Sequence, residues 1–186
     1  MFFKNKNKSI LELSNKIYKL IIKQSRINFF YTDLQVPDTV DGRFELIVLH
    51  FFFIDNAFKR EIKNHDDIYK ELLEIMYKDF DMSLREMGVG DLSVGKKIYH
   101  MTEALSGRIV AYRDVAKKSK TKIKNSLKKN VYGTVKSVNE NHLNELVEYF
   151  LDSIKYINDV AIDNISKNNA IFLDLNRYIN KLQKGI

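Results

Sequence analysis

The stretch GVGDLSVGKK (Gly88–Lys97) has the glycine and lysine spacing of a phosphate-binding loop. In such a loop, backbone N–H groups surround the phosphates, and a Ser or Thr after the lysine holds Mg²⁺. Gly90, Gly95 and Lys96 have the required spacing, but Lys97 stands where the hydroxyl is needed. The preceding residues, YKDFDMSLREM, have a helical period, whereas a phosphate loop follows a buried strand. The sequence therefore predicts no ATP or GTP site here.

The same ten residues fit a corner between two helices. Gly88 is expected to end the first helix in a left-handed conformation, and Asp91 to cap the second. Gly95 would let a neighbouring backbone approach closely. The start of the second helix, with Lys96 and Lys97, stays open as a place that could attract a phosphate head group.

No other group of residues indicates catalysis, so we expect no enzyme activity, cofactor or metal. The chain has no Cys, which excludes disulfides and thiolate metal sites, and no Gly-x-Ser-x-Gly motif. Its histidines lie far apart in the sequence, without metal-ligand spacing: His50, His65, His100 and His142. His50 lies in an apolar run and is interpreted as a hydrogen-bonded core residue. Asp81 and Arg85, four apart, are expected to form an ion pair.

Composition indicates one ordinary helical domain with an unevenly distributed charge. The chain has 186 residues, of which 45% are hydrophobic, with seven Gly and one Pro. The net charge is +7, with +6 over 1–26, −6 over 38–91, +10 over 92–136 and a mildly acidic remainder. Such asymmetry favours an anionic partner, either RNA or a lipid surface. The last segment includes a basic patch of seven lysines: Lys117, Lys118, Lys120, Lys122, Lys124, Lys128 and Lys129.

Six amphipathic patterns predict an all-α fold, a single compact bundle of about six helices. The first helix is expected to open at a capping box formed by Ser9 and Glu12. The others are expected at roughly 40–63, 66–87, 92–116, 140–165 and 168–184, the last stopping at Gly185. Residues 28–39, with Asp38 or Thr39 as a helix cap, are expected to be a loop, and the basic patch a frayed helix or loop. The most apolar run, LIVLHFFFI (Leu46–Ile54), is shorter than the roughly 20 residues that span a bilayer.

Two long motifs resemble the ubiquinol–cytochrome c chaperones, assembly factors of respiratory complex III. They are VPDTVDGRFELIVLH (Val36–His50) and LREMGVGDLSVGKK (Leu84–Lys97), supported by YKLIIKQSR and MTEALSGRIVAY (Met101–Tyr112). The matching positions are Asp38, Asp41, Gly42, Arg43, Glu45, His50, Arg85, Glu86, Asp91, Lys96, Arg108 and Tyr112. We divide the chain into a basic segment, residues 1–16, and a chaperone-like helical domain, residues 17–184.

The resemblance implies a non-enzymatic chaperone that binds newly made cytochrome b, whether or not a small partner protein takes part. With no long amino-terminal targeting extension, a cytoplasmic bacterial member at the periphery of the inner membrane is expected. The basic segments would then meet a ribosome or an anionic membrane surface, without recognising a nucleic-acid sequence. The alternative is a peripheral helical protein in which those segments bind RNA or anionic lipid as the main function.

A membrane-protein client requires apolar surface on its chaperone. The sequence candidates for that surface are aromatic: Phe29, Phe30, Tyr31, Phe51, Phe52 and Phe53. Polar motif residues such as Asp41, Arg43 and Glu45 are interpreted as groups that lock helices together rather than as reactive groups.

Overall fold

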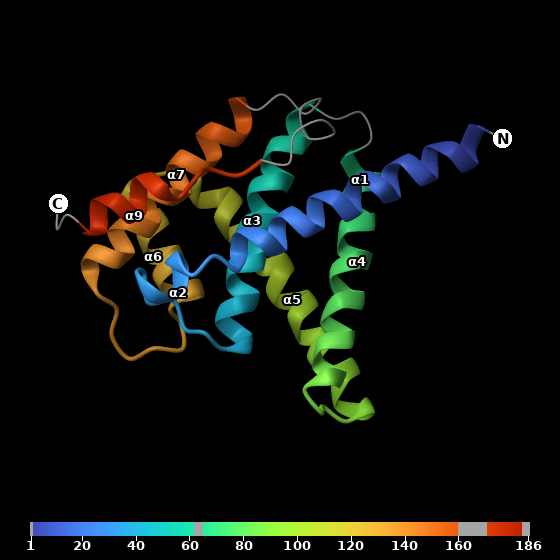
Figure 1. The fold of residues 1–186 in the computed structure, drawn as a ribbon, viewed down its shortest axis with the longest axis horizontal. Helices are drawn as coiled ribbons and strands as arrows, with labels where there is room; N and C mark the ends of the chain where they lie inside the picture. Colours follow the sequence, from blue (N-terminus) through green and yellow to red (C-terminus); the bar gives the residue numbers. More distant parts are fainter. Residues whose placement is uncertain (1, 62–64, 160–170, 184–186) are drawn as a thin grey trace.

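The chain folds as a helical bundle (Figure 1), in a computed structural model that describes residues 2–61, 65–159 and 171–183. Within these ranges every regular element is a helix, so the predicted all-α fold class is confirmed. None of these helices is long and apolar enough to span a bilayer. The helices are α1 (Phe2–Ser25), α2 (Phe29–Thr32), α3 (Val40–Glu61), α4 (His65–Glu86), α5 (Asp91–Val115), α6 (Lys120–Val131), α7 (Glu140–Asp159) and α9 (Asn176–Gln183).

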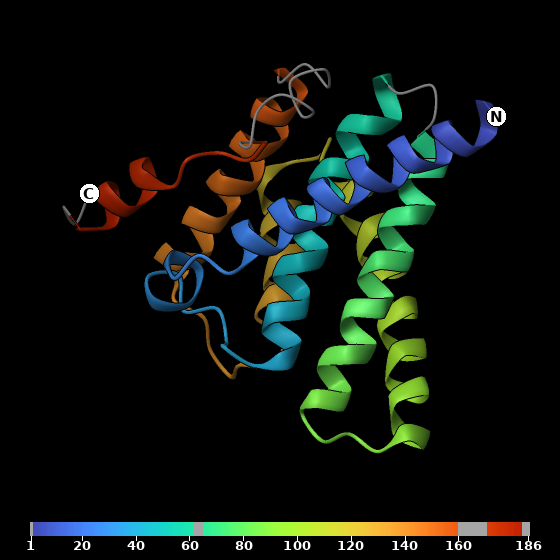
Figure 2. The same cartoon turned by 45° about the vertical axis from the view of Figure 1, so that its right-hand side comes forward.

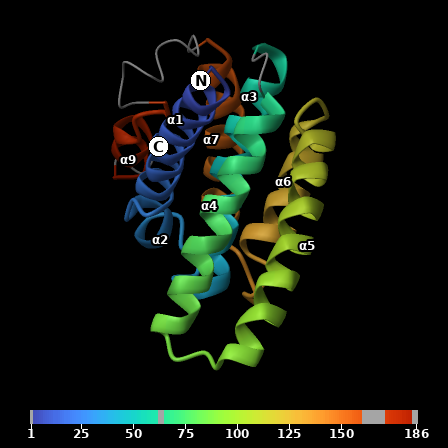
Figure 3. The same cartoon turned by 90° about the vertical axis from the view of Figure 1, so that its right-hand side faces the viewer.

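Helix α3 lies at the centre of the bundle, in contact with α1, α4, α5, α6 and α7. Helix α1 crosses α3 and α4 on one side, while α6 and α7 pack together on another. Helices α4 and α5 form a hairpin whose turn projects beyond the remainder of the bundle (Figures 2 and 3). The start of α3 lies near this hairpin, and it is here that the grooves described below are found.

The central position of α3 explains its run of three phenylalanines, Phe51–Phe53. Successive side chains on a helix point about 100° apart, so three in a row are buried only when several neighbours cover the helix. The first ring packs against Tyr69 of α4, with centroids 5.5 Å apart. The second packs against Tyr112 of α5 at 5.5 Å, and the third against Phe150 of α7 at 5.5 Å. The rings are 1%, 0% and 0% exposed.

The expectation that these rings offer apolar surface to a client is therefore wrong. It is also wrong for Phe29 and Phe30, which lie in the short helix α2 and are 2% and 0% exposed. Tyr31 is only half-buried, and its hydroxyl donates a hydrogen bond to the Ser25 carbonyl at 2.7 Å. The aromatic residues hold the core together, and the segment expected to be a loop contains a helical turn.

Two helices differ from the sequence expectation. Helix α1 begins at Phe2, so Ser9 and Glu12 lie inside the helix and do not form its cap. Helix α6 occupies most of the Lys-rich segment, which was expected to be frayed or irregular. Its buried edge has four-residue spacing and consists of Ile123, Leu127 and Val131. This edge packs on α7 and stabilises a helix that is otherwise almost entirely polar.

Most of the remaining helix bounds agree with the sequence where they can be compared. The starts of α3, α4, α5 and α7 and the ends of α4 and α5 lie within one residue of the predicted bounds. The predicted extension of α7 to residue 165 and the predicted final helix start at 168 lie outside the described residues, as does the stop at Gly185. The predicted final helix is wrong over residues 171–175, which are described and not helical; α9 begins only at Asn176.

The corner between α4 and α5 has the left-handed glycine that the sequence predicts. Gly88 has φ = 80°, and its N–H donates to the Arg85 carbonyl while the Val89 N–H donates to the Leu84 carbonyl. This pair of bonds is a Schellman motif, which ends α4. The chain therefore enters the glycine-rich stretch from a helix, not from a strand as a phosphate loop would.

The second half of the corner differs from the expectation. The N-cap of α5 is Gly90, in an extended conformation without a side-chain cap, so the assignment of Asp91 as N-cap is wrong. Asp91 is the first residue of the helix, where a carboxylate still favours the positive end of the helix dipole. A Cβ on Gly95 would meet nothing within 4 Å, so no neighbouring backbone approaches it.

The start of α3 depends on a close approach between backbone segments. The Thr39 hydroxyl accepts a hydrogen bond from the Gly42 N–H at 3.2 Å, which confirms Thr39 as a helix cap. A Cβ on Gly42 would stand 1.9 Å from the Pro37 carbonyl oxygen, far inside contact distance. Gly42 therefore lets the chain turn tightly from Pro37 into the first turn of α3.

We expect Gly42→Ala to lower the free energy of unfolding by about 1–3 kcal/mol, because the new methyl group forces the Pro37 carbonyl to move. The matched control is Gly107→Ala in the interior of α5, where a Cβ meets nothing within 4 Å. That change should stabilise the protein by about 0.5–1 kcal/mol, the helix propensity gained over glycine. Urea denaturation measures both, and equal effects of the two changes would contradict the close approach.

Candidate functional site

A groove of about 520 Å³ lies between the start of α3, the middle of α5 and the end of α6. We call it the polar groove because its charged or ionisable lining comes from all three helices: Asp41, Glu45, Lys97, His100, Arg108 and Lys129. Three of these residues, Asp41, Glu45 and Arg108, belong to the positions that match the family motifs. The motif residues, far apart in sequence, are thus brought together by the fold.

A second groove of about 550 Å³ adjoins the first, between the start of α3 and the end of α4. We call it the apolar groove because half of its lining residues are apolar: Val40, Phe44, Ile47, Phe80, Leu84, Met87 and Met101. Val40 and Met87 are 47% and 54% exposed, so this wall is open to solvent. Four residues line both grooves, which makes the two one continuous surface: Val40, Phe44, Leu84 and Met101.

The floor of the polar groove is an ion pair between α3 and α5. The Arg108 Nη2 and Nε donate to Glu45 Oε1 at 2.7 and 3.0 Å. Burial raises the pKa of Glu45, while the hydrogen bond from Arg108 opposes that rise. A buried carboxylate needs such a partner, so this pair fixes α5 against α3. The interpretation of Glu45 as a packing lock agrees with this geometry.

Other charged motif residues form ion pairs in the turns that lead into α3 and α5. Arg43 Nε donates to Asp38 at 2.6 Å, across the turn that leads into α3. Arg85 Nε donates to Asp81 at 2.7 Å, as the sequence predicts, and Arg85 Nη1 also donates to Asp91 across the α4–α5 corner. These pairs are exposed, so they orient local chain more than they stabilise the fold.

The other motif residues lie at different places around the grooves. Glu86 is an exposed residue on the lining of the apolar groove. Lys96 is exposed on α5 and lines neither groove among the lining residues of the described chain. Tyr112 is fully buried, with burial raising its pKa, and its ring packs against Phe52. The motif residues therefore divide into groove-lining positions, core positions and exposed positions outside the grooves, the last being Arg85, Asp91 and Lys96.

His50 is a core residue with a hydrogen bond on each ring nitrogen. Nδ1 lies 2.7 Å from the Leu46 carbonyl oxygen, and Nε2 lies 2.7 Å from the Tyr149 hydroxyl of α7. Since a carbonyl only accepts, we assign the proton to Nδ1, and the Tyr149 hydroxyl donates to Nε2. The Gln24 amide of α1 donates in turn to the Tyr149 oxygen at 3.3 Å. The sequence interpretation of His50 is confirmed.

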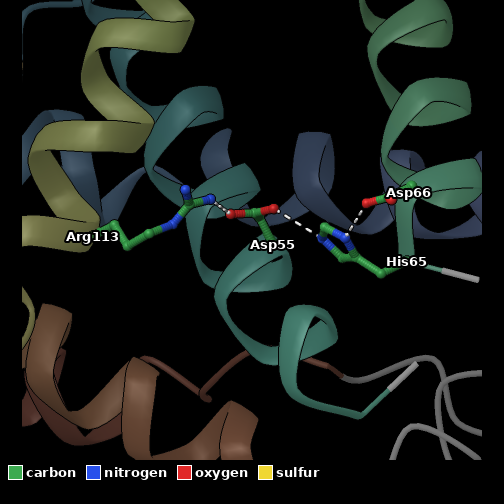
Figure 4. Close-up of polar contacts among 4 residues, drawn as sticks. All are labelled: Asp55, His65, Asp66 and Arg113. Carbon is green, nitrogen blue, oxygen red and sulfur yellow. Dashed lines mark hydrogen bonds and ion pairs between the residues drawn. The ribbon is translucent and has the colours of Figure 1, made fainter. Parts of the chain in front are cut away.

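A buried carboxylate that sequence reasoning missed is Asp55 of α3 (Figure 4). It is 3% exposed and lies between an arginine and a histidine, with Arg113 Nη2 of α5 at 2.5 Å and His65 Nε2 of α4 at 3.0 Å. His65 Nδ1 also lies 3.1 Å from Asp66. The available signal was an Asp at the end of the LIVLHFFFI run, because a charge among buried residues must have a partner.

The basic patch is largely paired with the protein's own carboxylates. Lys118 contacts Asp114 at 2.6 Å, and Lys120 contacts Glu148 at 2.6 Å. Glu140 accepts from Lys124 at 2.5 Å and lies 3.9 Å from Lys128. The other three patch lysines have no ion pair with a described residue: Lys117, Lys122 and Lys129. Of these, Lys129 lines the polar groove.

Open grooves with apolar walls and charged edges, formed at helix ends, are features of an all-α protein that binds another chain. Among the described residues no group of three or more His, Cys, Asp or Glu is placed to hold a metal ion. The chain belongs to the ubiquinol–cytochrome C chaperone family, whose profile matches residues 32–172. That range contains all groove-lining residues of the described chain except Arg26.

A solved structure agrees with this assignment. The chain is similar to the Cbp3 homolog from Brucella abortus, with 25% sequence identity and a TM-score of 0.80. The similarity covers 95% of this chain and 97% of that chain. No curated protein sequence matches the chain.

We expect the stability of the protein to decrease between pH 6.5 and pH 4 because of His50. Burial lowers the pKa of His50 from 6.5 to about 4, so in this window the unfolded chain binds a proton that the folded chain excludes. The contribution is fully present above pH 6.5 and is lost as the pH falls, by about 2 kcal/mol at about pH 5. Urea denaturation at several pH values measures it. His50→Gln should flatten the curve in this window, and an unchanged slope would contradict the assignment.

We expect Arg108→Met to lower the free energy of unfolding at neutral pH by about 3 kcal/mol, because it leaves Glu45 buried without a cation. The double change Glu45→Gln/Arg108→Met should cost less, since no buried charge is left. The loss in the single variant should shrink as the pH is lowered and Glu45 protonates. Denaturation of the three proteins at two pH values measures this. A double variant less stable than the single one would show that the pair is not the constraint.

Proposed function

We propose that the protein is an assembly chaperone of ubiquinol–cytochrome c reductase, and that it binds newly made cytochrome b through the apolar groove. Family membership supports the assembly role. The observation that supports the binding site is the convergence of residues from three motif segments, Val36–His50, Leu84–Lys97 and Met101–Tyr112, on one open surface. No enzymatic step is part of this proposal.

The chemistry of the apolar groove suits an unassembled membrane subunit. Such a subunit exposes apolar side chains that later pack against other subunits and lipid, and a chaperone must cover them meanwhile. Val40 and Met87 give the groove exposed apolar edges, while Phe44 and Leu84 give it a buried floor. A groove of this kind takes the apolar face of a short helix or extended segment. The rings of Phe51, Phe52 and Phe53 line neither groove, so they support the site without touching the client.

The place of action that we propose is the cytoplasm, at the periphery of the inner membrane. There the basic patch would meet a ribosome or an anionic membrane surface, through lysines that lack a partner within the described chain, such as Lys117 and Lys122. The alternative, in which RNA or lipid binding is the main function, has weaker support. Four of the seven patch lysines already contact a carboxylate of the protein itself.

We expect Val40→Asp to weaken capture of cytochrome b about tenfold and to reduce the level of complex III, because it places a charge on the apolar wall. The fold should be retained, since Val40 is exposed and an Asp suits the first turn of a helix. The matched control is Val110→Asp, a 63% exposed residue of α5 that lines neither groove. The measurements are affinity capture from cells with and without cytochrome b synthesis, and the complex III level.

The two hypotheses predict opposite patterns in these cells. A variant with Lys117→Gln and Lys122→Gln should keep a near-normal complex III level if the apolar groove carries the function. Loss of complex III in this lysine variant, with a normal level in folded Val40→Asp, would refute the proposal and support the binding of RNA or lipid. Each variant is first shown to be folded by its melting temperature.

A further inference from the structure

The polar groove carries positive charge that the protein does not neutralise. Lys97 of α5 and Lys129 of α6 both line it, both are exposed, and neither has an ion pair with a described residue. They come from different helices and from segments 32 residues apart in the sequence, so only the fold puts them in one groove. A local run of charge does not explain this arrangement.

The carboxylates of the same groove do not cancel these lysines. Glu45 is already neutralised by Arg108, whose Nη2 lies 2.7 Å from Oε1. Asp41 is the one further carboxylate among the lining residues of the described chain, and it opposes two lysines. The start of α3, a helix of 22 residues, also lines the groove and adds the partial positive charge of its first N–H groups. The groove therefore favours an anionic group.

The shared wall decides which kind of anion fits. Val40, Phe44, Leu84 and Met101 line both grooves, so a chain lying in the apolar groove continues directly into the polar one. A free phosphate would use the lysines but leave this apolar wall empty. A protein segment uses both, with apolar side chains on the shared wall and carboxylates at Lys97 and Lys129.

We propose that the polar groove binds Asp or Glu side chains of a protein segment whose apolar residues lie in the apolar groove. This inference rests on the proposed function, since it describes which segment the same surface selects. The selected segment has an apolar stretch followed by acidic residues. Such pairing across a groove supplies specificity and faster association in addition to the affinity of apolar burial.

The test uses the purified protein and two labelled, acetylated peptides of about twelve residues. Both peptides begin with the same leucine-rich half. The first, the glutamate peptide, ends in about three glutamates, and the second, the glutamine peptide, has glutamines at those positions. We expect the glutamate peptide to bind about tenfold more tightly at low salt, measured by fluorescence anisotropy. The difference should shrink as the salt concentration rises from about 50 to about 500 mM. Equal affinities at low salt would overturn the proposal.

Two variants locate the effect. Lys97→Gln/Lys129→Gln should remove the preference for glutamate and leave the affinity for the glutamine peptide unchanged. The matched control, Lys117→Gln/Lys122→Gln, removes the same charge outside the groove and should keep the preference. Asp41→Asn should increase the preference, because it removes the opposing carboxylate. If the control reduces the preference as much as the groove variant, the net charge of the protein is responsible and the proposal is wrong.

Failure of this inference can be told apart from failure of the proposed function. In one outcome, both peptides bind with equal affinity and Val40→Asp abolishes the binding. In that case only the polar groove assignment fails. If neither peptide binds, both fail. Vesicles containing an anionic phospholipid form a third arm. Binding to them that is lost in the Lys97→Gln/Lys129→Gln variant, without a glutamate preference, would identify a lipid head group as the occupant and overturn the proposal.

Discussion

The burial of α3 on nearly every side is the constraint on which the remaining structure depends. Water cannot solvate a charge on the buried part of a helix, so each buried ionisable group there needs a partner from a neighbouring helix. Glu45 and Asp55 are met by two arginines of α5, and His50 is met by a tyrosine of α7. These polar contacts come from defined positions on defined helices. They therefore set the register of α5 and α7 against α3, which apolar packing alone would leave less specific.

The surface that we propose for client binding lies where this constraint ends. At its first turn α3 emerges from the bundle, and its residues there face solvent on one side and the core on the other. Val40 and Asp41 are exposed, whereas Phe44 and Glu45 one turn later are buried. Both grooves open along this transition. The motif around α3 thus serves two purposes: its beginning shapes an open surface, and its continuation anchors that surface to a rigid core.

An element could be predicted from the sequence when residues close together in the chain determine it, and could not when distant residues do. Apolar stripes at helical spacing locate α3, α4 and α5 closely, because the period is written in local sequence. The same approach left α6 open between a frayed helix and a loop, because its three buried apolar residues stand among lysines. It missed α2, which is too short to show a period. Whether Phe51–Phe53 face solvent depends on how many helices surround α3, which no local pattern contains. Likewise, Lys129 joins Lys97 in one groove only through tertiary structure.

The His50 network has a consequence for how the protein is made. It joins α1 to α7 through the contact between Gln24 and Tyr149, which are 125 residues apart, and the rings of α7 also cover Phe52 and Phe53. During translation the amino-terminal half leaves the ribosome long before α7 exists to close the core. Until then the surfaces of Phe52 and Phe53 that α7 later covers stay open and can associate with other chains. A member of a chaperone family thus passes, during its own synthesis, through a state in which part of its own core is open to other chains.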